Sequence, residues 1–171
     1  QGVSLDQLLS DVKVLDLTHY IAGPYCTKLL ADYGADVLKI ERPGTGDGAR
    51  RLGPFQGDVP HPEKSGLFLH LNTNKRGITL NLKSGTAKDI FMQLIKWADI
   101  VVESFSPGVM PALGLGYKTL SKVNPKLVMT SISNFGQTGQ YRDFKASNLT
   151  LDAMGNSMNA RGDPDREPIK L

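Results

Sequence analysis

Two basic side chains in this sequence stand where a ligand could be bound, directly after predicted strands. Arg42 lies just beyond the apolar run at residues 37–40, and Lys83 follows the run at residues 78–82. Guanidinium and ammonium groups make charge-assisted hydrogen bonds to phosphate oxygens, so fixed cations at strand ends suit a phosphorylated ligand. The positions of Arg42 and Lys83 therefore favour an anionic small molecule.

The chain offers little for metal or cysteine chemistry. Cys26 is the one cysteine, which excludes an internal disulfide and a cysteine-based zinc site, and a small buried apolar role suits it better than nucleophilic attack. His19, His61 and His70 are scattered without the spacing of metal ligands. We therefore expect no metal site and no permanently bound cofactor.

Composition narrows the class of protein further. The chain has 171 residues, 40% of them hydrophobic and 22% charged, with a net charge of +3, as is usual for a globular domain. Its basic residues are dispersed among carboxylates, which argues against nucleic acid as a partner. The sequence shows neither an apolar run of about 18 residues nor a secretory signal, so we expect no membrane association and a cytoplasmic location.

The order of the predicted elements indicates an α/β fold, a Rossmann-like doubly wound and mostly parallel sheet with its ligand beyond the strand carboxyl ends. Ser84 is a predicted N-cap, Lys75 and Arg76 are expected at a turn, and residues 43–66 form a long loop. The strands are predicted at residues 12–17, 37–40, 68–71, 78–82, 100–102 and 127–133. The helices are predicted after residue 24, after residue 84, and near residues 109–113, 118–123 and 149–154.

A series of short motifs carries a family resemblance along nearly the whole chain. The motifs are Ile21-Ala22-Gly23-Pro24-Tyr25, Leu29 to Val37, Lys39 to Gly44 with Gly46-Asp47 and Arg50, Asn72 to Lys83, Ala98 to Glu103, Phe105 to Gly108, Leu113 to Tyr117, Val123 to Val128 and Ser133 to Gly139. In this order they resemble the family III CoA-transferases, the group related to formyl-CoA transferase and carnitine CoA-transferase. The resemblance rests on the shared order of the motifs, because any one motif alone is weak evidence for the family.

The resemblance implies an enzyme that moves CoA from an acyl-CoA to a carboxylic acid through an aspartyl anhydride and thioester intermediate. Residues 1–171 would be the N-terminal CoA-binding part of an incomplete large domain, with the small domain absent. The nucleophilic Asp is expected just beyond Leu171, so we assign no catalytic residue and expect this fragment alone to be inactive. Family members form interlocked dimers, which implies a homodimer for the full-length protein.

The resemblance also assigns CoA-binding residues by their match to family positions. CoA or acyl-CoA is expected as substrate, with Arg42 and Lys83 near its phosphates and Ile21 and Ala22 near its pantetheine and acyl end. Ser104 departs from the usual Asn of its motif. The full predicted set is Ile21, Ala22, Arg42, Leu80, Asn81, Leu82, Lys83, Ser104, Phe105, Ser106, Lys145, Ala146, Ser147 and Asn148.

Other activities compete with CoA transfer between acids. Acyl-CoA racemases of the same superfamily place a catalytic His-Asp pair where this chain has Ser147 and Asn148. Neither of those side chains can serve as the proton-transferring base, which disfavours racemisation. Intramolecular CoA transfer and a non-catalytic CoA-binding fragment remain as alternatives.

Overall fold

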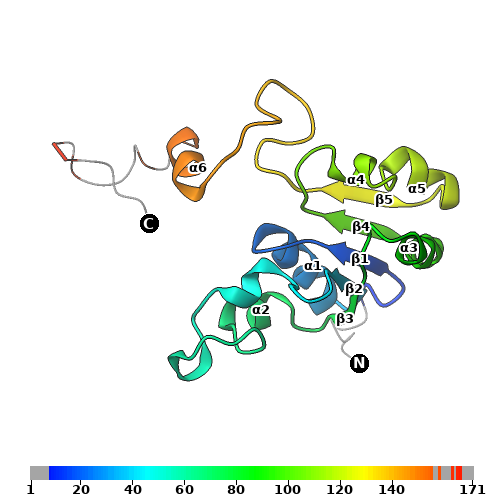
Figure 1. Cartoon of the computed structure of the whole chain (residues 1–171), viewed down its shortest axis with the longest axis horizontal. Helices are drawn as coiled ribbons and strands as arrows, with labels where there is room; N and C mark the ends of the chain where they lie inside the picture. The colour runs from blue at the N-terminus through cyan, green and yellow to red at the C-terminus, as the bar shows by residue number, and fades with distance from the viewer. Residues whose placement is uncertain (1–7, 156–157, 159–162, 164, 167–171) are drawn as a thin grey trace. The chain divides into compact units, whose positions relative to one another are not determined.

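The computed structural model describes residues 8–155, 158, 163, 165 and 166. The chain divides into two compact units, residues 1–132 and 133–171, and each is described by itself (Figure 1).

The first unit is built on a parallel sheet of five strands in the order β3-β2-β1-β4-β5 (Figure 1). The strands are β1 (Lys13–Leu17), β2 (Asp36–Glu41), β3 (Arg76–Thr79), β4 (Ile100–Glu103) and β5 (Val128–Ser131). Each neighbouring pair is parallel, so all the strand carboxyl ends lie along one edge, which we call the carboxyl edge. This confirms the predicted doubly wound α/β fold.

Helices and short 3-10 turns connect the strands. They are α1 (Ala22–Asp32), η2 (Gly48–Arg51), η3 (Gln56–Asp58), α2 (Gly66–Leu71), α3 (Gly85–Trp97), α4 (Val109–Ala112) and α5 (Tyr117–Val123). The chain passes from β1 through α1 to β2 on one side, and reaches β4 through α3 on the other side of β1. The change of direction between β1 and β4 is the topological switch point, where open α/β sheets bind ligands.

Alternation along the strands divides the core into two clusters. Leu15 and Leu17 of β1 pack with Phe91 and Ile95 of α3, whereas Val14 packs with residues from the opposite face, including Ala31 of α1. Side chains in a strand point alternately to its two faces, so one buried strand supplies both clusters. Helices therefore cover both faces of the sheet.

The structure corrects one local expectation and confirms the position predicted in another. Residues 68–71 were predicted as a strand but belong to α2, whose N-cap Ser65 accepts a hydrogen bond from the Phe68 amide at 3.1 Å. A run as short as Phe68-Leu69-His70-Leu71, with three apolar residues, does not distinguish a strand from a buried helical turn, and here the Ser65 cap decides. Ser84 does occupy the N-cap of α3, but its side chain makes no capping hydrogen bond.

The second unit contains α6 (Asn148–Met154) and a small group of aromatic rings. Ser147 begins α6 with a capping box, in which its hydroxyl accepts from the Thr150 amide and Thr150 Oγ1 accepts from the Ser147 amide at 2.8 Å. The rings of Phe135, Tyr141 and Phe144 lie with centroids 5.2–6.3 Å apart.

Candidate functional site

Four of the five predicted CoA-binding segments lie at the carboxyl edge. Ile21 and Ala22 connect β1 to α1, Arg42 follows β2, residues 80–83 follow β3, and residues 104–106 follow β4. Because the strands are parallel, these segments share one edge although they are distant in the sequence. The fifth segment, residues 145–148, belongs to the second unit.

Two of these segments contact residues that lie just before the other two. The His19 amide, at the end of β1, donates a hydrogen bond of 2.8 Å to Ser104 Oγ, and the His19 ring lies 5.8 Å from the ring of Phe105 between centroids. The Leu80 amide donates to the Glu41 carbonyl at 3.0 Å, which places the segment after β3 beside the residue that precedes Arg42. Residues 104 and 105 thus contact the turn that leads to Ile21, at the switch point, and Leu80 contacts the residue before Arg42.

The predicted CoA-binding residues differ in the exposure of their side chains. Some are open to a ligand, and others pack against the core. Ile21 is 53% exposed, and Ala22, Arg42, Asn81, Lys83 and Ser106 are also exposed. Leu80, Leu82 and Phe105 are partly buried against the core cluster on the α3 face. Leu80, Leu82 and Phe105 therefore contribute to the core on the α3 face.

Charged side chains form a buried network next to the β1–α1 turn. This network was not predicted from the sequence. Asp16 of β1 is fully buried and stands opposite Lys39 of β2 in the sheet register. Its carboxylate accepts hydrogen bonds from Thr18, from Thr27 Oγ1 at 2.6 Å and from Lys75 Nζ at 3.0 Å. Burial alone would raise the pKa of Asp16, but Lys39, Lys75 and these hydroxyls outweigh it and lower the pKa.

Lys75 and Arg76, expected together at a turn, have different surroundings. Lys75 Nζ is almost completely buried and also donates to the Pro24 carbonyl at 2.9 Å, so it ties β3 to the start of α1. Burial lowers its pKa. Arg76 is exposed and pairs with Asp36 at the amino ends of their strands. Only Lys75 belongs to the buried network.

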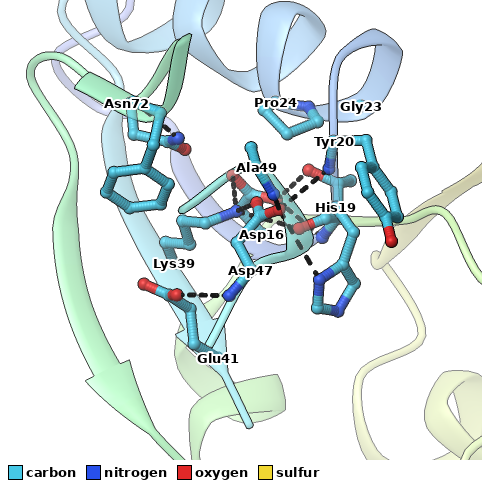
Figure 2. Close-up of polar contacts among 12 residues, drawn as sticks. Asp16, His19, Tyr20, Gly23, Pro24, Lys39, Glu41, Asp47, Ala49 and Asn72 are labelled. Carbon is cyan, nitrogen blue, oxygen red and sulfur yellow. Dashed lines mark hydrogen bonds and ion pairs between the residues drawn. The ribbon is translucent and has the colours of Figure 1, made fainter. Parts of the chain in front are cut away.

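Asp47 connects the long loop to the turn after β1 (Figure 2). Its fully buried carboxylate accepts from the Tyr20 amide and the Ala49 amide, each at 2.9 Å, and its Oδ2 lies 2.9 Å from Lys39 Nζ. Lys39 in turn donates to the Thr18 carbonyl at 2.8 Å. Both ends of this ion pair therefore hold the backbone of residues 18–20.

That turn has an unusual backbone conformation. Tyr20 has φ of +66°, in the left-handed region that non-glycine residues seldom occupy. Its ring lies against Gly48, where an added Cβ would come within 2.4 Å of the ring. The hydrogen bond from Tyr20 to Asp47 and the close packing on Gly48 keep the turn in this form. Strained conformations of this kind persist only where the surroundings enforce them, and they cluster at functional sites.

Glu41 and Arg50 anchor the remainder of the loop. Arg50 makes two hydrogen bonds of 2.8 Å to the Glu41 carboxylate and lies over the Phe68 ring, 3.7 Å from its centroid. The Asp47 amide also donates to Glu41, at 2.7 Å. Burial would raise the pKa of Glu41, but Arg50 and this amide lower it. Residues 41–51 are thereby fixed at the carboxyl edge, next to Arg42.

The network left a signal in the sequence. Asp16 and Lys39 are single charges inside otherwise apolar runs, Val14-Leu15-Asp16-Leu17 and Val37-Leu38-Lys39-Ile40. A charged residue in a buried strand requires a partner, and the two strands that carry these charges are neighbours. Asp47 belongs to one of the family motifs, but neither it nor His19, both in loops, showed from the sequence that it would join this network.

The described residues contain neither a group of metal ligands nor a helix that could span a membrane. Within residues 8–155 and the few described beyond them, no group of three or more His, Cys, Asp or Glu side chains could hold a metal ion. None of the helices in that part of the chain is long and apolar enough to cross a membrane.

The parallel sheet, its switch point and the segments gathered at the carboxyl edge define an α/β domain of the open-sheet, ligand-binding type. A model of CoA-transferase family III matches residues 9–171. The chain therefore belongs to CoA-transferase family III, which confirms the resemblance carried by the motifs.

Named relatives are similar over nearly all of this chain. Acetyl-CoA:oxalate CoA-transferase of Acetobacter aceti is 42% identical over 92% of this chain and 39% of its own length. Formyl-CoA:oxalate CoA-transferase of Afipia carboxidovorans is 44% identical over 94% and 37%. A CAIB/BAIF family protein from Brucella suis, solved by crystallography, has a TM-score of 0.86 and 34% identity over 100% of this chain and 44% of that protein. The chain spans about two fifths of the length of the curated relatives it matches.

Proposed function

We propose that the full-length protein containing this chain transfers CoA from an acyl-CoA to a carboxylic acid. The observation that carries the proposal is the match to CoA-transferase family III over residues 9–171. It is supported by relatives at 42% and 44% identity that are named as CoA-transferases. The acids named for those relatives do not decide the acids used here.

The proposed chemistry proceeds through an aspartate. An aspartyl carboxylate attacks the thioester carbonyl and the CoA thiolate leaves, which gives a mixed anhydride. The thiolate then attacks the aspartyl carbonyl of this anhydride, which forms an enzyme thioester and releases the donor acid as its carboxylate. The incoming carboxylate attacks that thioester and expels the thiolate, and the thiolate attacks the acyl carbonyl of the second anhydride, which gives the new acyl-CoA and frees the aspartate. This divides one difficult exchange into easier steps, and backbone amides would stabilise the developing oxyanion. We place this aspartate outside residues 1–171, so this chain alone has no transferase activity.

In this proposal the chain supplies the CoA-binding part of the large domain. Arg42 and Lys83 are exposed and follow neighbouring strands at the carboxyl edge, a position suited to the CoA phosphates. Ile21 and Ala22 face the pantetheine and acyl end, and the other predicted residues complete the site. A homodimer and a cytoplasmic location belong to the same proposal.

Racemisation of the acyl group is the alternative that the chemistry disfavours. Ser147, at the position of the racemase base, makes its hydrogen bonds in the capping box of α6. It has no imidazole with which to remove an α-proton. A non-catalytic CoA-binding role would require that the full-length protein lack the nucleophilic aspartate.

An exchange assay tests the function directly. Full-length protein incubated with acyl-CoA and a panel of carboxylic acids is expected to form new acyl-CoA species without deuterium entering the α-carbon from D2O. Deuterium exchange without transfer would assign the protein to isomerase chemistry. Robust transfer by residues 1–171 alone would overturn the placement of the nucleophile.

A binding measurement tests the phosphate site. Arg42→Ala is expected to weaken CoA binding about tenfold in calorimetry, because a charge-assisted hydrogen bond is lost. Arg76→Ala is the matched control, since Arg76 is an exposed arginine at the amino end of β3. Equal affinities for CoA in the two variants would remove Arg42 from the site.

A further inference from the structure

His19 occupies the switch point itself. It follows β1, and its amide is bonded to Ser104 at the end of the neighbouring strand β4. The ring is packed near Phe105 on one side and faces Asp47 on the other (Figure 2). His19 thus lies between the ends of β1 and β4, the position at which open α/β sheets bind their ligands.

The ring nitrogens of His19 have no hydrogen bond within the described residues. Nδ1 is 3.8 Å from Asp47 Oδ1, which is beyond hydrogen-bonding distance. The two oxygens of Asp47 are already engaged by Tyr20, Ala49 and Lys39. The His19 side chain is 24% exposed, so a ligand at the switch point can reach it. The ring nitrogens are thus left without a hydrogen bond from the described residues and are open to solvent or to a ligand.

The ring is uncharged at neutral pH. Burial lowers the pKa of His19, and Lys39 and Arg42 lower it further, against the opposing effect of Asp47 and Asp16. A neutral imidazole offers one N–H donor and one acceptor instead of a positive charge. It is therefore suited to an uncharged carbonyl oxygen, whereas phosphate groups are served by Arg42 nearby.

We propose that His19 is a ligand-binding residue of the acyl-CoA site, donating a hydrogen bond to a carbonyl oxygen of the pantetheine or thioester portion. This inference rests on the proposed function, because it requires CoA at the carboxyl edge. The Asp47–Lys39 pair holds the backbone on either side of His19 and so positions the Cα from which the side chain extends.

Calorimetry on the full-length protein can test this with two ligands, CoA and adenosine 3′,5′-bisphosphate, which lacks pantetheine. His19→Ala is expected to weaken CoA binding roughly 3- to 10-fold, the range for one neutral hydrogen bond, and to leave bisphosphate binding unchanged. His19→Gln, whose amide can donate, is expected to recover part of the loss. His70→Ala is the control, an exposed histidine in α2.

The outcomes separate this inference from the function on which it rests. Unchanged CoA affinity in His19→Ala, or an equal loss for both ligands, would overturn the role of His19 while leaving CoA transfer standing. Absence of CoA binding by the parent protein would instead overturn the proposed function. Thermal midpoints of the variants show whether any loss of binding arises from unfolding.

Discussion

The two faces of the sheet use the same strands for different purposes. On the α3 face, alternate strand residues such as Leu15 and Leu17 pack with Phe91 and Ile95 in an apolar cluster. On the α1 face, Val14 begins an apolar cluster, but the next residue on that side is Asp16, which accepts from Thr27 of α1. The apolar face contributes stability through burial. On the α1 face, Asp16 and Lys39 take the place of apolar side chains. Their contacts hold the β1–α1 turn and the loop after β2 at the carboxyl edge.

The energetic character of the two faces differs accordingly. Removing apolar atoms from a packed core costs their transfer energy and leaves a cavity. A buried ion pair contributes little net stability, but removal of one partner leaves an uncompensated charge and is costly. Each face is therefore sensitive to substitution for its own reason, and matched variants can separate the two.

The largest expected effect is on the apolar face. Phe91→Ala should lower the free energy of unfolding by about 3–5 kcal/mol, because Phe91 is fully buried between α3 and the sheet. Denaturant unfolding followed by circular dichroism measures the change. Ile90→Ala is the control on the same helix, 45% exposed, and should cost less than about 1 kcal/mol. Similar losses in the two variants would contradict the assignment of this face as the main core.

The next effect is on the polar face. Lys39→Met should cost about 3 kcal/mol, because it leaves the buried Asp47 carboxylate without its cation. The same variant should bind CoA more weakly, since Lys39 and Asp47 hold the turn that carries His19. Arg76→Met breaks an exposed pair with Asp36 and should cost at most about 1 kcal/mol. Loss of stability without loss of CoA affinity in Lys39→Met would limit the network to a structural role.

The smallest predicted effect is a loss of folding stability when the pH is lowered from 7 to 5. The pKa of His19 is lowered by burial, so the unfolded chain takes up this proton first and stability falls as the pH drops below the ordinary value of 6.5. The pKa values of Asp16, Asp47 and Glu41 are also lowered, against the raising effect of burial, by their cations and hydrogen bonds. Their contribution is present above their ordinary values and is lost as the pH falls through the lowered ones, at stronger acidity.

Denaturant titrations at pH 7, 5 and 3 can separate these two stages. His19→Gln should remove most of the fall between pH 7 and pH 5 and leave the steeper fall below pH 4. The exposed variant Asp89→Asn should follow the parent throughout. A fall between pH 7 and pH 5 that is the same in His19→Gln and the parent would assign it to another group.

The sequence predicted strands and helices correctly where a single hydrophobic pattern dominated the segment. Apolar runs predicted β1 and β2 to within a residue or so, and the apolar spacing of Phe91 and Ile95 predicted α3. Residues 68–71 were mispredicted because a segment of four residues, three of them apolar, is too short to show a period. The segments of the predicted CoA site came from the family resemblance, and the parallel topology gathers four of them at one edge.

The buried network was missed because it depends on contacts between distant segments. Lys75 is 59 positions from Asp16, and Asp47 is 27 from Tyr20. No local pattern encodes such contacts, and a lone lysine before a strand reads as solvated. His19 was considered only as a metal ligand, since its position at the switch point is a property of strand order and not of spacing.

The close packing of Tyr20 on Gly48 has a consequence for protein engineering. Any side chain at position 48 would collide with the ring, and the Tyr20 amide depends on Asp47 in the same loop. The β1–α1 turn and residues 47–49 therefore form one transplantable module. A chimera that takes residues 47–49 from a relative should also take the β1–α1 turn from that relative. If only one of the two segments is exchanged, the packing of residue 20 on residue 48 is not preserved.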